Sequence, residues 1–328
     1  MTEPIDVVIT WVDGDDPTHA ARRALYQGSA HSSAGQDATR FADRDELYFC
    51  LLSILRHAPF VRLIHVVTDN QTPAAIARLA AQNIPGHQKI RLVDHHEIFR
   101  GHDTVLPVFN SISIESMLAR IEGLSEQFVM FNDDMMLTAK VQPQDWFQEG
   151  QVVLRGVWFG LGLTVLGWLR GHARHLPGLR APAARFSNKE ASRRAAVLAG
   201  LKGRTFVLAH APYPALKSHC LHLMQSLPGY FDNASHRFRS ADQFNVIALF
   251  SQAEIARHQP VVLGEDDVVY MRADRDRLDR VLQKIARVQA AGVKFLCIQS
   301  LDQASPPTAA AIADWLRNSY LADQAPTP

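Results

Sequence analysis

The feature that most constrains this fold is an apolar segment that runs directly into two adjacent carboxylates. Residues 128–131 read Phe-Val-Met-Phe, the sequence Asn132-Asp133-Asp134 follows, and apolar residues resume at Met135. Apolar runs this short, with β-branched and aromatic residues, are typical of strands that are buried on both faces. Because an unpaired carboxylate inside a core is strongly unfavourable, we expect the strand to end where these acids meet a partner.

Two roles for Asp133 and Asp134 are consistent with the sequence. Hard carboxylate oxygens at a strand end suit a divalent cation, Mg²⁺ or Mn²⁺, that also holds a phosphate. Alternatively, the acids cap the turn that follows the strand. Other features of the sequence are needed to distinguish a metal site from a turn.

Two more predicted strands also end in acidic turns. Residues 5–12 form the first, and Asp13 follows it directly, with Gly14 permitting a tight turn and close approach of a ligand. Residues 61–67 form the second, which runs into Thr68 and Asp69. The pattern of an apolar strand followed by an acid therefore occurs three times.

Segments with helical spacing separate the strands. Apolar residues recur at this spacing across residues 47–58, another helix begins at Pro73, and a third covers residues 111–121. A further strand is predicted at residues 89–93. This alternation predicts a Rossmann-like α/β fold, with a mostly parallel sheet and helices on both faces.

In such a sheet, Asp13, Asp69 and Asp133 would lie at the carboxyl ends of the strands. Ligands of open α/β sheets bind at this edge, so three acidic strand ends favour a shared site over three unrelated turns. The sequence Asp-His-His-Glu at 94–97 follows the strand 89–93. Neighbouring side chains of an extended segment point to opposite faces, so here a polar turn is favoured over a metal site.

Composition excludes several classes of function. The 328 residues carry a net charge of only +1, so no global field favours nucleic acid as a partner. The three cysteines, Cys50, Cys220 and Cys297, lie far apart without metal-binding spacing and are expected to be reduced core residues of a cytosolic protein. The first residues lack the basic and apolar regions of a signal peptide, and a cytoplasmic location is therefore predicted.

The segment 152–169 is apolar and long enough to resemble a membrane span, but Arg155 and four glycines argue against one. A basic tract follows, up to residue 204. An interfacial membrane anchor, a groove for an anionic polymer, and a helical subdomain with a solvated basic face are all consistent with this pattern. Peripheral contact with the inner face of the cell membrane would then run through residues 152–204.

The predicted organisation has three parts. Residues 1–147 form an α/β core that binds nucleotide and metal, and residues 148–204 form a variable helical and basic insert. Residues 205–328 complete the catalytic core and add C-terminal helices.

At this point the sequence resembles a known family. Residues 5–14 are similar to the first conserved region of the Stealth family, the sugar-phosphate transferases of bacterial capsule synthesis, which have an animal relative that transfers N-acetylglucosamine 1-phosphate. The motifs similar to the second region lie between Arg40 and Phe147: Asp-Glu-Leu (45–47), Val-Thr-Asp-Asn-Gln (67–71), Leu-Pro-Val-Phe-Asn-Ser (106–111), Ile-Glu-Ser (114–116), Gly-Leu-Ser-Glu (123–126) and Phe-Asn-Asp-Asp-Met (131–135).

Shorter motifs resemble the remaining two regions. His-Ala-Pro-Tyr-Pro at 210–214 and Arg-Phe-Arg-Ser at 237–240 are similar to the third, and Lys-Phe-Leu-Cys-Ile at 294–298 is similar to the fourth. The chain departs from the family at Ile112 and Ala119, where histidine is frequent. It also has Ser-Leu-Asp at 300–302, where the fourth region commonly has Asn-Asp.

The resemblance implies a glycosyltransferase-A-like fold and transfer of a sugar 1-phosphate from a UDP-sugar to a saccharide hydroxyl, with release of UMP. The implied donor is a UDP-hexose or a UDP-N-acetylhexosamine, and the implied acceptor is an oligosaccharide or polysaccharide, free or lipid-linked. The product would be a phosphodiester in a capsular or cell-surface polysaccharide. The alternatives are a metal-dependent glycosyltransferase that releases UDP, and a degenerate protein that binds carbohydrate or polyanion.

Phosphoryl transfer needs positive charge and a base, and the motifs offer both. Asp133 and Asp134 would hold the cation. Arg237 and Arg239 point to the same side if the segment is extended, and their planar donors suit phosphate. Two arginines on the protein surface without a ligand would give the same sequence pattern. His210 is the predicted base, because imidazole titrates near neutral pH. The residues predicted to bind the nucleotide sugar are Trp11, Asp13, Gly14, Asp69, Asn70 and Asn110.

Overall fold

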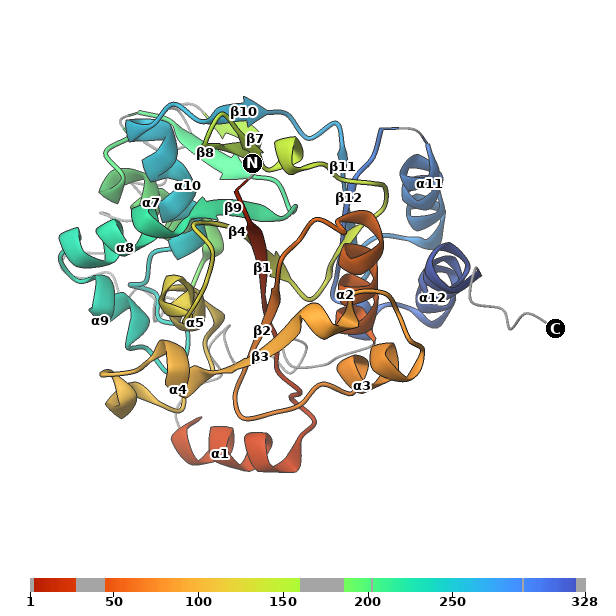
Figure 1. Cartoon of the computed structure of the whole chain (residues 1–328), viewed down its shortest axis with the longest axis horizontal. Coiled ribbons are helices and arrows are strands. Elements are labelled where there is room, and N and C mark those ends of the chain that lie inside the picture. Colours follow the sequence, from red (N-terminus) through yellow and green to blue (C-terminus); the bar gives the residue numbers. More distant parts are fainter. Residues whose placement is uncertain (1–2, 28–44, 160–185, 202, 291, 323–328) are drawn as a thin grey trace, which may run out of the picture.

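The computed structural model describes residues 3–27, 45–159, 186–201, 203–290 and 292–322. At its centre lies a five-stranded sheet with the order β3-β2-β1-β4-β9 (Figure 1). Its strands are β1 (Ile5–Thr10), β2 (Ile64–Thr68), β3 (Ile90–Asp94), β4 (Gln127–Asn132) and β9 (Tyr213–Leu216). The first four run parallel, and β9 pairs antiparallel with β4. The predicted mostly parallel sheet is therefore confirmed.

Two smaller sheets flank the central one. One has the order β10-β7-β6, with β8 also paired to β7, and the other has the order β11-β12-β5. Their strands are β5 (Met135–Leu137), β6 (Phe147–Gln148), β7 (Gln151–Phe159), β8 (Thr205–Leu208), β10 (Val261–Leu263), β11 (Val268–Arg272) and β12 (Phe295–Gln299). The chain passes from the central sheet to the second of these sheets between β4 and β5.

Three α-helices lie where helical spacing predicted them, at residues 46–57, 74–81 and 111–115, although the last ends before the predicted residue 121. The α-helices of the described residues follow in chain order. They are α1 (Pro17–Gln27), α2 (Glu46–His57), α3 (Ala74–Ala81), α4 (His95–Ile98), α5 (Ser111–Glu115), α7 (Asn188–Leu198), α8 (Lys217–Ser226), α9 (Tyr230–Ala234), α10 (Val246–Arg257), α11 (Leu278–Gln289) and α12 (Pro306–Leu321). In Figure 1, α2, α11 and α12 lie on one side of the central sheet and α8 and α10 on the other.

Strand β1 shows why the sheet is covered on both faces. Its side chains alternate between two hydrophobic clusters, because successive residues of a strand point to opposite faces. Val7 and Ile9 join the cluster that contains α2 and α12, whereas Val8 joins the cluster with α8 and α10. A continuous apolar run is thus explained by burial on both sides, as the sequence predicted.

The predicted helical insert needs a correction. Residues 151–159 form strand β7 instead of the start of a helix, whereas α7 is helical as expected. Strand β7 forms a hairpin with β6 and hydrogen-bonds to β8 and β10, and the long-range pairing with β8 and β10 has no local sequence signature. Residues 160–185, including the second half of the apolar segment, lie outside the described residues. The domain boundaries remain a prediction.

Arg155 and the cysteines occupy buried positions. The side chain of Arg155 is only 4% exposed, and its Nε donates to both oxygens of Asp267, at 2.9 Å each. Cys50, Cys220 and Cys297 are all free and buried, as expected. Within the described part of the chain, every helix is too short or too polar to cross a membrane.

Candidate active site

A cavity of about 960 Å³ opens at the carboxyl ends of β1 and β4. Thr10 and Asn132, the last residues of these two strands, contribute to its wall. Further parts of the wall come from α7, β8, the start of α10 and the turns that follow β11 and β12. The predicted edge of the sheet is therefore the place where segments from the whole chain converge.

Asp133 and Asp134 line this cavity in the turn between β4 and β5. Two contacts fix the backbone of the turn. The N–H of Ile298 donates to the carbonyl of Asp134 at 2.9 Å, and the Cys50 thiol lies 3.8 Å from the carbonyl oxygen of Asn132. The acids thus lie where the chain leaves one sheet and joins another.

Asp134 has an unusual electrostatic environment. Its Oδ1 is buried and has no hydrogen-bond partner among the described residues. Burial raises the pKa of Asp134 to about 6, against a smaller opposing effect of the hydrogen bond with Cys297. A divalent cation would compensate this buried charge. Since hard carboxylate oxygens are preferred ligands of Mg²⁺ and Mn²⁺, Asp133 and Asp134 fit the predicted ion.

His210 also lines the cavity, just after β8. Its ring stacks on Tyr270, with centroids 4.0 Å apart and planes 10° apart. Burial and the neighbouring Arg272 lower the pKa of His210 below its ordinary value. The imidazole is therefore neutral at pH 7 and can accept a proton, as a general base requires.

The two arginines predicted to bind phosphate lie in different places. Arg239 lines the cavity and donates from Nη2 to the Ser111 hydroxyl at 2.7 Å. Arg237 is absent from the described lining residues, and its Nη2 donates to the carbonyls of Thr104 and Leu106 at 3.1 and 3.3 Å. The segment bends at residues 237–238, so the same-side rule for extended chains does not apply.

Of the predicted nucleotide-binding residues, Trp11 and Asn110 reach the cavity wall. The Asn110 amide donates to the Gln243 side chain at 2.9 Å, and its oxygen caps α5. The described residues that line the cavity do not include Asp13, Gly14, Asp69 and Asn70.

These four residues lie instead in the loops beside the cavity. The N–H of Asp13 donates to the Gln71 side chain at 2.9 Å. Asp69 is buried and paired with Arg22 at 2.8 Å, and burial raises its pKa. The N–H of Asn70 donates to Asp94 at 2.7 Å. Gln71 and Asp94 thus tie the loops after β1, β2 and β3 together.

His95 has a different position from the predicted polar turn. It begins helix α4, is buried and lines the cavity, and burial lowers its pKa to about 4. His96 is exposed and pairs with Asp94, the N-cap of α4, at 2.8 Å. The two adjacent histidines therefore point in different directions, but from the start of helix α4 and not from an extended segment, which ends at Asp94.

Several basic side chains of the cavity wall, which together we call the basic wall, were not predicted from the sequence. Arg272 and Arg275 reach the cavity from the end of β11, and Lys189 and Arg193 reach it from α7. The α7 residues belong to the basic tract that the sequence showed. The strand end at Arg272 gave no signal of its own, because one arginine after an apolar run is common.

Family models match the first half of the chain. Residues 3–29 match the model described as Stealth protein CR1, conserved region 1, and residues 40–154 match Stealth protein CR2, conserved region 2. The resemblance predicted from these two regions is thereby confirmed.

Several relatives match less than half of the chain. An exopolysaccharide phosphotransferase of Streptomyces coelicolor is 46% identical over 144 residues, which cover 44% of this chain and 23% of the relative. A capsular polysaccharide phosphotransferase of Actinobacillus pleuropneumoniae is 39% identical over 44% of this chain and 38% of its own. A receptor polysaccharide phosphotransferase of Streptococcus oralis is 42% identical over 44% of this chain and 42% of its own. The chain thus spans less than half the length of these relatives.

Among solved structures, the chain is similar to the galactosyltransferase LgtC in complex with donor and acceptor sugar analogs. The two are 12% identical, with a TM-score of 0.48, and the alignment covers 98% of this chain and 97% of that chain.

Proposed function

We propose that this chain, which carries the first two conserved regions of the Stealth proteins, transfers a sugar 1-phosphate from a UDP-sugar to a saccharide hydroxyl. The names of the relatives support transfer of a phosphate-linked group in polysaccharide synthesis. The structural observation that carries the proposal is the buried carboxylate oxygen Oδ1 of Asp134, which has no hydrogen-bond partner among the described residues. Asp134 lies beside Asp133 at the carboxyl end of β4, in a cavity with basic side chains.

The carboxylates would bind phosphate through a metal ion, and the basic wall would bind it directly. Asp133 and Asp134 would hold Mg²⁺ or Mn²⁺, which supplies positive charge at the diphosphate. Arg239, Arg272 and Arg275 bring fixed guanidinium groups to the same cavity, and such groups suit phosphate oxygens. Arg237 would act indirectly, through the loop at residues 104–106 that it holds.

His210 would accept the acceptor proton. The acceptor oxygen forms a bond to the phosphorus that carries the sugar, and the bond from that phosphorus to the bridging oxygen of UMP breaks. UMP leaves with the electron pair, and the hydroxyl proton moves to the neutral His210 imidazole. Its lowered pKa keeps the imidazole unprotonated before the step.

The donor and acceptor would enter from different sides of the cavity. Trp11 and Asn110 lie near the strand ends, where nucleotides bind in α/β sheets, and Asp13, Gly14, Asp69 and Asn70 would shape the loops at the uridine end. Lys189 and Arg193 of α7 favour an anionic oligosaccharide or polysaccharide acceptor. A lipid-linked acceptor, a cytoplasmic location and membrane contact through residues 152–204 remain predictions.

The nucleotide product tests the proposal. The purified chain is incubated with a panel of UDP-sugars, Mg²⁺ and capsule-type oligosaccharides, and the nucleotides are separated by chromatography. UMP is expected, because the phosphate travels with the sugar. UDP would show glycosyl transfer with cleavage of the sugar–phosphate bond instead. Release of neither, with an oligosaccharide still bound in a binding assay, would favour a carbohydrate-binding protein.

A further inference from the structure

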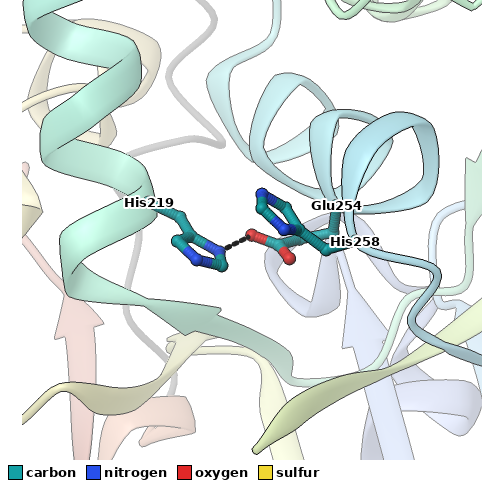
Figure 2. A group of neighbouring side chains, drawn as sticks. All are labelled: His219, Glu254 and His258. Atoms are coloured by element: carbon teal, nitrogen blue, oxygen red, sulfur yellow. Dashed lines mark hydrogen bonds and ion pairs between the residues drawn. The ribbon is translucent and has the colours of Figure 1, made fainter.

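A second group of potential metal ligands lies away from the active-site cavity. His219 of α8, together with Glu254 and His258 at the end of α10, can each offer one ligand atom, and these atoms lie within 4.8 Å of one another (Figure 2). We call these three residues the α8–α10 cluster. The residues described as lining the cavity do not include them.

The two helices bring the ligands together by simple geometry. Glu254 and His258 are four residues apart, so they lie on the same face where α10 ends. His219 comes from the first turn of α8 and hydrogen-bonds through Nδ1 to Oε1 of Glu254 at 2.6 Å. The two imidazole rings stack with their centroids 4.2 Å apart. Figure 2 shows the carboxylate of Glu254 beside the two stacked histidines, with its hydrogen bond to His219.

Glu254 is an independent reason to expect a ligand. Its side chain is only 7% exposed, and Oε2 is buried without a hydrogen-bond partner among the described residues. A buried carboxylate with half of its acceptor capacity unused is costly. A cation that binds Glu254 would relieve this cost more completely than the single hydrogen bond to His219.

We propose that the α8–α10 cluster binds one transition-metal cation, with Zn²⁺ as the best fit. Two imidazoles and one carboxylate form a ligand set that suits Zn²⁺ and leaves a fourth position for water. Mg²⁺ prefers oxygen ligands only, so this site and the proposed site at Asp133 and Asp134 select different ions. His258 is exposed and His219 is partly exposed, which gives the ion a path and allows both rings to turn toward it.

The position of the site assigns it a structural or regulatory role. Helix α10 has 12 residues and is therefore about 18 Å long. Asn245, Ile247 and Ala248 at its start line the active-site cavity, whereas the α8–α10 cluster lies at its end. A bound ion would clamp α8 to α10 and so hold one wall of the cavity without contact to substrate.

Metal titration of the whole chain tests this inference. After removal of metals with a chelator, Zn²⁺ is titrated by calorimetry, and Co²⁺ by visible absorption, which reports coordination by nitrogen and oxygen ligands. One equivalent is expected to bind, to raise the Tm, and to persist in excess Mg²⁺. His258→Ala and Glu254→Gln are expected to weaken binding at least about tenfold, the cost of losing even an outer-shell partner.

The matched control is His222→Ala, since His222 is an exposed histidine of the same helix α8 outside the cluster. This variant is expected to bind Zn²⁺ like the unmodified chain. Because His258 is exposed, its replacement leaves the core intact, and circular dichroism checks this. Equal Zn²⁺ affinity in His258→Ala, Glu254→Gln and His222→Ala, or no binding in any of them, would overturn the proposal. Transferase activity does not enter this readout.

Discussion

At the scale of single residues, the chain keeps a costly carboxylate where its proposed chemistry needs one. Burial raises the pKa of Asp134 from an ordinary value of 3.8 to about 6. Between these two values the unfolded chain has lost the proton that the folded chain still holds. Without a cation, Asp134 therefore makes the folded state less stable as the pH rises toward neutrality. A bound ion reverses this penalty. Removal of the charge should therefore preserve or raise the stability of the metal-free chain while it lowers the activity.

Asp134→Asn is expected to keep or raise the Tm of the metal-free chain at pH 7, because the amide removes a buried charge. Turnover should fall at least about a hundredfold, as expected for a lost metal ligand, and Mg²⁺ should no longer raise the Tm. Thermal unfolding with and without Mg²⁺ and UMP release measure these effects.

Asp314→Asn is the control for this variant, because Asp314 is exposed and pairs with Arg317 on the surface of α12. It should leave both quantities unchanged. Full activity and an unchanged Mg²⁺ response in Asp134→Asn would refute the metal site.

His210 is the second residue whose environment predicts a measurable effect. Its pKa is lowered by burial and by Arg272, so kcat/KM should fall only when the pH drops below the ordinary histidine value of about 6.5. His210→Ala should lose about a hundredfold or more in kcat with little change in donor affinity, and the acid limb should disappear. Donor binding is measured by calorimetry and turnover by UMP release. Lost donor affinity with an intact pH profile would instead make His210 a binding residue.

At the scale of elements, sequence patterns predicted what is local. The strand at residues 127–132 followed from one apolar run, and the turn at Asp133 followed from the acids that end it. Strand β7 did not follow, because most of its hydrogen bonds go to β8 and β10, which are distant in sequence. For the same reason, Arg272 could not be assigned to a wall shared with His210: the two residues are 62 positions apart in the chain and come together because the ring of His210 packs on Tyr270 of β11.

Gly156 allows β7 and β8 to approach closely. A Cβ at this position would lie 2.2 Å from the carbonyl oxygen of Val207, so the strands have to separate when a side chain is added. Gly156→Ala is expected to destabilise the chain by about 1–3 kcal/mol. It should also lower kcat, because β8 leads directly to His210. Urea unfolding and UMP release measure the two effects.

Gly264→Ala provides the comparison for the glycine variant. A Cβ there would have only an ordinary contact, 3.7 Å from Asp266, and stability should change little. An equal loss of stability in both variants would mean that the contact with Val207 is not the cause.

At the scale of the whole molecule, the cavity depends on three sheets that keep their relative positions. Arg155 of β7 connects two of them, because it pairs with Asp267, beside the start of β11, and stacks over Phe295 of β12 at 4.5 Å. It also donates from Nη1 to the carbonyl of Asp145 at 2.8 Å. The Arg155 side chain is 4% exposed, and a charge on so buried a side chain is costly unless its partner is present. This ion pair should therefore matter far more than one on the surface.

Asp267→Asn is expected to reduce the free energy of unfolding by about 3 kcal/mol, because it leaves the Arg155 charge buried without a counterion. Asp279→Asn should cost less than about 1 kcal/mol, since the pair of Asp279 and Arg277 is 71% and 89% exposed. Adding Arg155→Met to Asp267→Asn should restore part of the lost stability, because the uncompensated charge disappears with its side chain. Urea unfolding of these three variants and of the unmodified chain measures the changes. Equal small losses in the two aspartate variants would show that the two sheets hold their relative positions without this ion pair.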